Sequence, residues 1–411
     1  MGEFFQADDF EVTDKLLAVR IDLNSKVDDT VHINERFYAH ADAVNHLVGK
    51  NARIILLAHQ SRKGEPDFVS LKKHAEVFSK VLGHEVKFVD DVIGEKARGA
   101  INKLSSGEIL MLDNVRFLPD EDVEKSIEEH ANSSLVKFLS PLIDYYVLDA
   151  FSVAHRSHAS IVGFSLVKPT IAGETMRKEI EAIDAVTDPS GSTGWIMGGA
   201  KIDDCISVLK NILTKTPDSI EKVLTGGMLA NLFMHANGYS IGSGSLLLLK
   251  EKGHLKLLDD AKFLMKNFND KIVLPVDVAF SERGRRVEQK IENIPLSATI
   301  FDIGSETVEM YKEMLNDFSS VVVKGPMGKF EDPIFAYGTR ELLDKIASSN
   351  LLSLIGGGDT SVAIETFKID KNKFSHISVG GGALISFLSG KPMPGIDALR
   401  KSYEKFTQSS L

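Results

Sequence analysis

The chain has 411 residues, of which 43% are hydrophobic and 26% are charged, and its formal net charge is −10. This composition excludes a disordered or collagen-like chain and predicts a globular protein large enough for two domains. The negative charge argues against a surface that binds nucleic acid, and the apolar runs are too short to cross a bilayer. The single cysteine, Cys205, cannot form an intrachain disulfide. Because no basic start leads into an apolar signal core, we expect a cytoplasmic protein without membrane or nucleic-acid partners.

Short apolar runs recur along the chain with amphipathic stretches between them. The first part predicts strands at LLAVRIDL, ARIILLA, EVKFV, EILML and YYVLDAF, with helices over 70–82 and 121–139. The second part predicts strands at WIMG, KVLTGG, KIVLPVDV, SVVVKG and LLSLIGGG, with helices over 203–213 and 306–317. Such alternation is typical of parallel sheets covered by helices. The predicted fold class is therefore α/β, with two doubly wound, Rossmann-like lobes.

The lobes are predicted to join through a connector. The stretch FSLVKPTIAGETMRKEIEAIDAV has a Pro-containing loop and then a charged, amphipathic helix, which suits a stiff hinge, although a surface helix has the same pattern. We therefore predict an N-terminal lobe over 1–168, a hinge helix within 169–190 and a C-terminal lobe over 191–388. The amphipathic segment 389–411 is predicted to pack back on the N-terminal lobe.

Polar side chains follow the strands of the first half, where ligands collect in α/β sheets. The candidate substrate-binding residues are Asp22, Asn24, Arg36, His59, Arg62, Arg116 and Arg156. Each arginine alone is more often a solvated ion-pair partner, but four at equivalent positions indicate a small polyanionic substrate. His59 lacks a second ligand at metal spacing, so we expect it to form hydrogen bonds. Asp22 and Asn24 either share one face of a strand or cap a loop.

Glycine-rich turns follow the strands of the second half. They include Gly198, Gly199, Gly226, Gly227, Gly325, Gly328, Gly357, Gly358 and Gly380 to Gly382. A strand, a glycine turn and a helix start present backbone N–H groups to an anion, although glycine there can also serve close packing alone. Lys201 is the natural cation for a transferred phosphoryl group, and Asp359 can hold a divalent cation or cap a helix. Neither a GxxxxGK[ST] loop nor a GxGxxG fingerprint is present.

These motifs, taken in order, resemble those of the phosphoglycerate kinase family. VRIDLN, NERF, AHQSR, LDNVRF, DAFSVAHRSHAS, GGAKI, TGGM, LPVDV, KGPMGKFE, GGGDT and SVGGGA cover nearly the whole chain. The resemblance implies reversible phosphoryl transfer from 1,3-bisphosphoglycerate to Mg-ADP, giving 3-phosphoglycerate and ATP in glycolysis or gluconeogenesis, by a monomer that uses Mg²⁺. Other small-acid kinases and a catalytically silent nucleotide binder are the alternatives, and a nicotinamide dehydrogenase is a distant one.

The resemblance also implies roles for individual residues. The seven polar residues of the first half correspond to the family's phosphoglycerate contacts. Arg36 and Lys201 correspond to groups that contact the transferred phosphoryl group, Glu331 to the acid that binds the ribose, and Asp359 to the magnesium ligand. The implied nucleotide contacts are Gly199, Lys201, Gly226, Gly227, Gly325, Glu331, Gly357, Gly358, Asp359 and Thr360.

Several residues depart from the family pattern. Cys205 stands where many members have a second lysine, and Lys324 and Val323 replace a common Asn and Trp before GPMG. These changes look closer to the archaeal branch. They leave open how the ADP phosphates are neutralised, because the direction of the Lys324 side chain cannot be read from the sequence.

Overall fold

A computed structural model describes residues 4–187 and 191–408. The chain divides into two compact units, Met1–Ile180 with Pro392–Leu411 and Glu181–Lys391. The boundary between them falls within helix α7 (Glu174–Thr187), inside the range that the sequence assigned to a connector. Use of this helix as a hinge stays a prediction.

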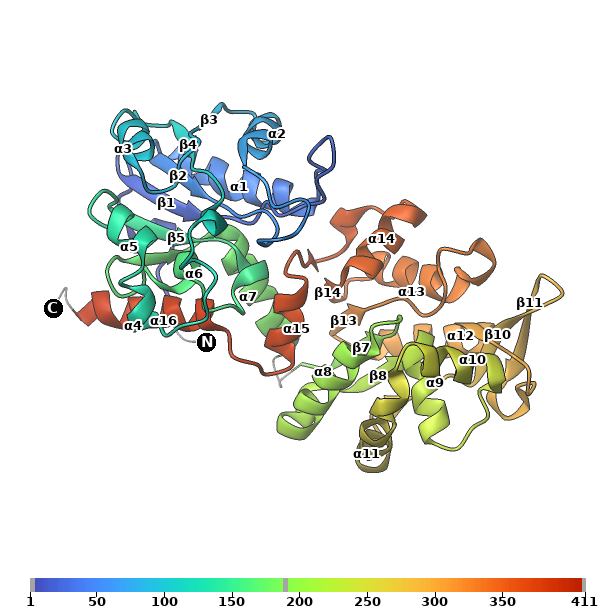
Figure 1. Ribbon diagram of the computed structural model, residues 1–411. Helices are drawn as coiled ribbons and strands as arrows, with labels where there is room; N and C mark the ends of the chain where they lie inside the picture. Colours follow the sequence, from blue (N-terminus) through green and yellow to red (C-terminus); the bar gives the residue numbers. More distant parts are fainter. Residues whose placement is uncertain (1–3, 188–190, 409–411) are drawn as a thin grey trace. The chain divides into compact units, whose positions relative to one another are not determined.

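The first unit is built on a six-stranded parallel sheet with the order β3-β4-β2-β1-β5-β6. Its helices lie on both faces of the sheet (Figure 1). The strands are β1 Leu16–Arg20, β2 Arg53–Leu57, β3 Val86–Phe88, β4 Ile109–Met111, β5 Tyr145–Leu148 and β6 Thr170–Ala172. The α-helices besides α7 are α1 Glu35–Gly49, α2 Lys72–Leu82, α3 Glu95–Ile101, α4 Ile127–His130, α5 Ser134–Leu139, α6 Ala159–Val162 and α16 Pro394–Gln408.

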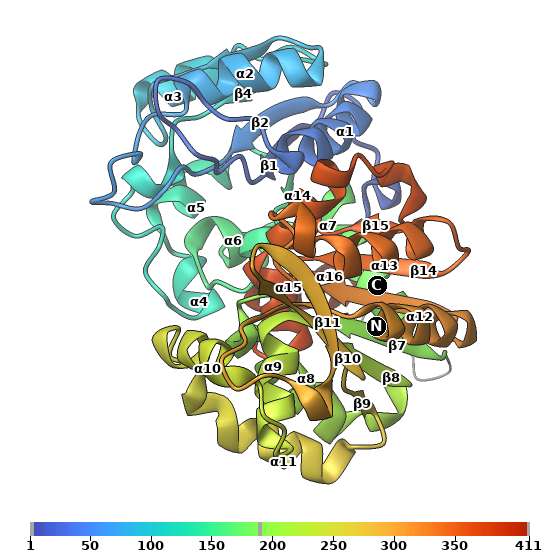
Figure 2. The ribbon, with the colours of Figure 1, turned by 90° about the vertical axis from the view of Figure 1, so that its right-hand side faces the viewer.

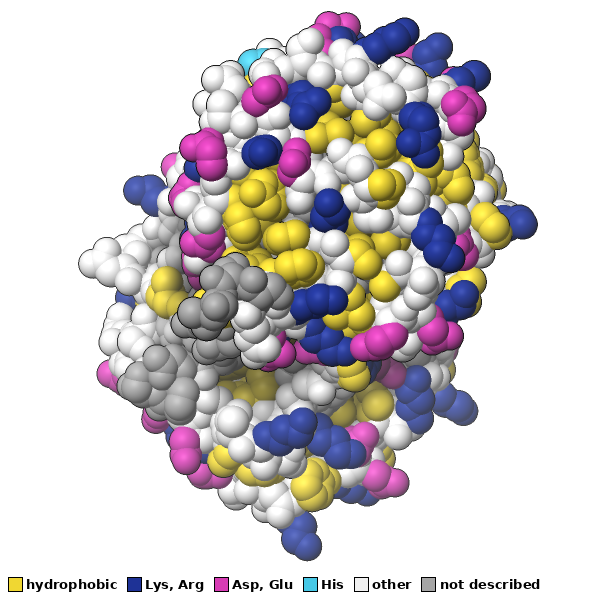
Figure 3. Space-filling view, turned by 90° about the vertical axis from the view of Figure 1, so that its left-hand side faces the viewer, with side chains coloured by type: hydrophobic (Ala, Val, Ile, Leu, Met, Phe, Trp, Pro, Cys, Tyr) yellow, Lys and Arg dark blue, Asp and Glu magenta, His cyan; other side chains and the backbone are white. Residues whose placement is uncertain are grey.

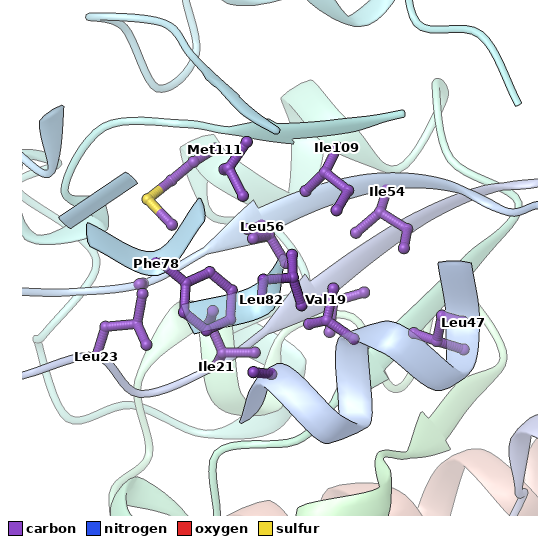
Figure 4. Close-up of a cluster of buried hydrophobic side chains, with 14 of the residues drawn as sticks. Val19, Ile21, Leu23, Leu47, Ile54, Leu56, Phe78, Leu82, Ile109 and Met111 are labelled. Atoms are coloured by element: carbon purple, nitrogen blue, oxygen red, sulfur yellow. The ribbon is translucent and has the colours of Figure 1, made fainter. Parts of the chain in front are cut away.

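Both faces of this sheet are buried, which explains why its strands read as continuous apolar runs. On one face, Val19 and Leu56 pack with Leu47 of α1 and Phe78 of α2 (Figure 4). On the other, the ring of Tyr146 stacks on that of Phe164 at 4.0 Å, directly after α6. The sheet is therefore fixed from two sides, and its carboxyl edge is left for polar side chains.

Helix α16 belongs to the first unit although it ends the described chain. The backbone N–H of Thr170 in β6 donates to Ser402 Oγ at 2.8 Å. The ring of Tyr403 lies 4.9 Å from that of Phe5, whose carbonyl accepts from Ala172 N–H. Both ends of the described chain thus pack at the β6 side of one sheet.

The second unit has its own six-stranded parallel sheet, with the order β15-β14-β13-β7-β8-β9, and a three-stranded antiparallel sheet, β11-β10-β12 (Figure 2). The strands are β7 Thr193–Met197, β8 Lys222–Thr225, β9 Ile272–Val273, β10 Asp277–Glu282, β11 Arg285–Lys290, β12 Ile300–Ile303, β13 Ser320–Lys324, β14 Leu352–Gly356 and β15 His376–Ile377. The α-helices are α8 Ile202–Lys215, α9 Gly227–Ala236, α10 Gly242–Glu251, α11 Leu258–Phe268, α12 Ser305–Met314, α13 Tyr337–Ala347, α14 Gly358–Phe367 and α15 Gly382–Leu388. The predicted fold class is confirmed, and the antiparallel sheet is an addition.

Two predicted elements were wrong. The helix expected over 121–139 is two short helices, because Ser126 caps α4 with Glu129 and the Asp120 carboxylate accepts from Ser134 N–H at 2.7 Å, where α5 starts. The strand expected at KIVLPVDV stops as two-residue β9. Pro275 has no N–H for a ladder, and β10 then starts in the antiparallel sheet.

Charged side chains are mixed over the face in Figure 3, where Lys and Arg alternate with Asp and Glu and surround smaller apolar areas. Among the described residues, none of the helices has both the length and the hydropathy needed to span a bilayer.

Candidate active site

A polar pocket lies at the carboxyl edge of the first unit's sheet. It contains five of the seven predicted substrate-binding residues together with two carboxylates. Its lining residues are Asn24, His59, Ser61, Arg62, Glu65, Asp67, Arg116 and Arg156. They follow β1, β2, β4 and β5, which are neighbours around β2 and β1, so the chain's parallel topology brings them together.

Asp22 and Arg36 lie beside each other, next to this pocket. Asp22 is 1% exposed, and its Oδ2 accepts from Arg36 Nη1 at 3.0 Å and from the Ser152 hydroxyl. Burial favours the neutral acid, but the charge of Arg36, then the hydrogen bonds from Ser152 and the Asn24 N–H, hold the pKa of Asp22 well below its ordinary value. Asp22 is therefore a fixed negative charge that orients the Arg36 guanidinium.

The expected alternation of Asp22 and Asn24 on a strand was wrong. Strand β1 ends at Arg20, and Asp22 Oδ1 accepts from the Asn24 N–H at 2.9 Å, which is the loop-capping alternative. Asn24 then accepts from the Ser61 N–H at 2.7 Å through its side chain. Both residues fix the loops of the pocket as well as facing it.

His59 is held in one neutral form. Arg20 Nη2 lies 3.1 Å from His59 Nδ1, and because a guanidinium only donates, Nδ1 accepts and the proton sits on Nε2. Burial lowers the pKa of His59 well below its ordinary value, and although Asp22 opposes this, Arg20, Arg116 and Arg156 add to it. His59 therefore offers a neutral N–H donor among arginines.

We expect the imidazole carbon resonances of His59 to stay at their neutral positions from pH 8 to pH 5.5. The NMR spectrum of His59→Gln assigns the signals. The pKa of His59 is lower in the folded than in the unfolded chain, so the unfolded chain takes up the proton first as the pH falls. The contribution of His59 to the free energy of unfolding is therefore fully present above pH of about 6.5 and decreases below that value. A His59 signal that titrates near its ordinary pKa contradicts the buried, Arg20-bound geometry.

Sequence reasoning missed the buried residues that support the pocket. Arg20, the last residue of β1, is almost fully buried, and its Nε donates to Ser160 Oγ at 2.8 Å. Ser160 in turn donates to Glu121, through its hydroxyl at 2.5 Å and its N–H at 2.9 Å. An arginine inside the apolar run LLAVRIDL was a visible signal, because a charge is buried only when it is paired.

The arginines of the pocket repel one another. Burial, together with the charges of Arg20 and Arg156, lowers the pKa of Arg116 to about 10, so it remains protonated at neutral pH. Burial and Arg62 likewise lower the pKa of Arg156. A bound anion relieves this repulsion, which makes the pocket suited to carboxylate or phosphate.

The second unit contains a larger pocket of about 480 Å³ with mostly apolar walls. Apolar side chains of α9, β12 and the β13–α13 connection form it, including Met228, Met234, Ile300, Phe301, Met327 and Phe330. Of the predicted nucleotide contacts, Gly199, Gly227, Glu331 and Asp359 line it, and Gly226, Gly325, Lys201, Gly357, Gly358 and Thr360 do not. An apolar pocket with a few polar groups, such as Glu331 and Asp359, suits a purine nucleotide.

The glycines fall into two groups. A Cβ on Gly226 would lie 2.5 Å from the Met327 sulfur, and one on Gly325 would lie 2.4 Å from the Gly198 carbonyl. These glycines allow loops to approach each other, and the Gly325 N–H is bound to Thr360 Oγ1 at 2.9 Å. A Cβ on Gly358 would meet nothing within 4 Å, so this backbone at the start of α14 is open to a ligand.

Lys201 and Asp359 approach each other at the edge of this sheet. Their Nζ and Oδ2 atoms are 3.7 Å apart, at the starts of α8 and α14, and the side chains are 72% and 51% exposed. Within residues 4–187 and 191–408, no group of three or more His, Cys, Asp or Glu could hold a metal alone. A single carboxylate fits Mg²⁺, which usually binds one or two carboxylates plus substrate phosphates and water.

Comparison with known proteins identifies the family. The family model for phosphoglycerate kinase matches residues 7–391. Phosphoglycerate kinases of Methanothermus fervidus and Methanococcus maripaludis are 39% and 42% identical, and each alignment covers 98% of this chain and 99% of the relative. The crystal structure of the Pyrococcus horikoshii phosphoglycerate kinase is 38% identical, with a TM-score of 0.87 over 98% of this chain and 100% of that one. The chain therefore belongs to the phosphoglycerate kinase family.

Proposed function

We propose that this chain transfers a phosphoryl group reversibly from 1,3-bisphosphoglycerate to Mg-ADP, giving 3-phosphoglycerate and Mg-ATP. One observation carries the proposal: arginines gather beside a buried, neutral histidine at the carboxyl edge of the first unit's sheet, and the second unit has an apolar pocket near an open helix N-terminus. The first suits a small acid with phosphate groups, and the second suits a purine nucleotide.

The first unit would bind the acid. Arg62, Arg116 and Arg156 supply guanidinium groups for phosphate, and His59 donates from Nε2. Asp22 and Asn24 accept from or donate to the substrate hydroxyl. The ion pair with Asp22 orients the Arg36 guanidinium, which would contact the carboxyl end and the transferred group. His59, Arg116 and Arg36 are held by Arg20, the Ser61 carbonyl and Asp22, so their binding of a substrate requires little reorganisation.

The second unit would bind ADP. Gly199, Gly226, Gly227 and Gly325 shape the purine and ribose slot, in part by letting loops approach. Glu331 accepts from the ribose hydroxyls. At the α14 start, Gly357, Gly358 and Thr360 supply the phosphate loop, and Asp359 would hold Mg²⁺. The metal, when bound, adds positive charge next to the phosphate oxygens.

Transfer needs no general base. The acyl phosphate is already activated, and its P–O bond to the carboxyl breaks as an ionised β-phosphate oxygen of ADP forms the new P–O bond. Arg36 and Lys201 would stabilise the charge on the equatorial oxygens, and the helix N-termini would add partial positive charge. The work of the protein is therefore positioning and neutralisation.

We also propose that α7 is a hinge, that the protein is a cytoplasmic monomer, and that binding of both substrates brings the units together and excludes water. Small-angle scattering with 3-phosphoglycerate and a non-hydrolysable ATP analogue is expected to give a smaller radius of gyration than the free protein at a monomer's mass. An unchanged radius contradicts the closure.

A coupled assay of ATP formation tests the function. With 1,3-bisphosphoglycerate, ADP and Mg²⁺, the purified chain is expected to form ATP, and it should not do so with acetyl phosphate as donor. Activity with acetyl phosphate alone favours another small-acid kinase. Binding of ADP without turnover on any acyl phosphate favours a silent nucleotide binder, and either result overturns the proposal.

A further inference from the structure

Lys324 is a buried lysine at the carboxyl edge of the second unit's sheet. It is the last residue of β13, and it is 7% exposed. In the sheet register it pairs with Met197 of β7 and Gly356 of β14. Glycine turns follow on both neighbouring strands, and α8 and α14 start directly after them. Its position is thus between two helix N-termini.

The partners of Lys324 are weak. Its Nζ donates to Cys205 Sγ at 3.5 Å, and its nearest carboxylate, the half-exposed Asp204, is 3.7 Å away. Burial raises the pKa of the Cys205 thiol even though Lys324 opposes this, so the thiol stays neutral at pH 7 and cancels no charge. A buried ammonium usually requires a closer anion than these two groups provide.

The surroundings of Lys324 point to the phosphate loops. Paired residues of neighbouring parallel strands face the same side, and a Cβ on Gly356 would meet Leu384 of α15 at 2.7 Å. Lys324 therefore faces the side that α8 and α15 cover, where these helices lie next to each other (Figure 1). Helix α14 begins at Gly358, two residues after Gly356, the register partner of Lys324, and a Cβ on Gly358 would meet nothing within 4 Å.

We propose that Lys324 is a second phosphate-binding cation of this chain. Its buried ammonium at the end of β13 would neutralise the diphosphate of ADP together with the exposed Lys201 at the start of α8. The inference rests on the proposed nucleotide site and adds a buried positive charge to it. Lys201 is exposed and has Asp359 as its partner. Lys324, in contrast, is prearranged and desolvated, which strengthens its attraction for phosphate oxygens.

Calorimetric titration of Lys324→Met with ADP and with adenosine tests the proposal. We expect ADP to bind about tenfold to a hundredfold more weakly, the scale of a lost charged hydrogen bond, while adenosine binds as in the wild type. The KM for ADP should rise, and the affinity for 3-phosphoglycerate should not change. Lys312→Met is the matched control, because Lys312 is a half-buried lysine that, unlike Lys324, is closely paired with Glu309 of α12 and Glu341 of α13.

A second experiment moves the positive charge from position 324 to position 205. Since Lys324 Nζ contacts Cys205 Sγ, the double variant Lys324→Asn/Cys205→Lys returns an ammonium to the same place from α8. We expect ADP affinity within about threefold of the wild type in the double variant, and a loss in Lys324→Asn alone. This arm also serves if Lys324→Met does not fold, as judged by circular dichroism.

The outcomes are distinct. If wild-type protein binds ADP and folded Lys324→Met binds it equally well, Lys324 is not a phosphate ligand. If ADP and adenosine weaken equally, its role is structural, and the proposal is overturned. If wild-type protein binds neither compound, the proposed nucleotide site itself fails.

Discussion

Alanine in place of Arg36 or Lys201 is expected to lower turnover by at least about a hundredfold, the scale of losing one group that stabilises transition-state charge. Arg36 is held by buried Asp22 at 3.0 Å, and Lys201 lies 3.7 Å from Asp359. Both lie near the places where we propose that the phosphoryl group is given and received. The coupled assay at saturating substrates measures the effect.

Matched controls separate charge at the site from charge elsewhere. Arg53→Ala removes an arginine of β2 that is paired with Asp14, and Lys210→Ala removes a lysine of α8 that is paired with Asp260. Both controls are expected to retain near-normal rates, as surface pairs contribute little. Arg36→Lys keeps the charge and loses the fork, so it should fall between wild type and Arg36→Ala. Near-normal rates in Arg36→Ala and Lys201→Ala would remove these residues from the mechanism.

Methionine in place of Arg20 is expected to reduce the free energy of unfolding by roughly 3–5 kcal/mol, the usual cost of breaking a buried charge network. Arg20 does not itself line the pocket, but it contacts His59 there, and it donates to Ser160, which in turn binds buried Glu121. Burial raises the pKa of Glu121 and Arg20 opposes this, so removal of Arg20 leaves a carboxyl group that must take up a proton or remain uncompensated. Chemical denaturation at pH 7 measures the loss.

Arg20 is a positioning residue, and two readouts test that role. In Arg20→Met, His59 Nδ1 loses its donor, so the ring nitrogen shifts should report a mixture of tautomers, and 3-phosphoglycerate should bind more weakly. Glu121→Gln in the same background should recover part of the lost stability, because it removes the uncompensated acid. Unchanged stability and an unchanged His59 spectrum would contradict the network.

The sequence by itself determined the two-lobe α/β fold and the polar residues that meet at the carboxyl edge of the first sheet. Strand ends carried Asn24, His59, Arg62, Arg116 and Arg156, and parallel topology obliges such residues to meet at one edge, which the structure confirms as a common pocket. The motifs, in their order along the chain, identified the family. These properties depend on local pattern and connectivity, which the order of residues records directly.

Only the tertiary structure decided how charges are balanced. The pairing of Arg20 with His59 spans 39 positions, and that of Arg20 with Ser160 spans 140, so spacing along the chain does not reveal them. Likewise, the direction of the Lys324 side chain follows from the register of β13 against β7 and β14. The packing of α8 then brings Cys205 beside it. Long-range packing sets burial, and burial decides whether a charge is solvated, paired or available to a ligand.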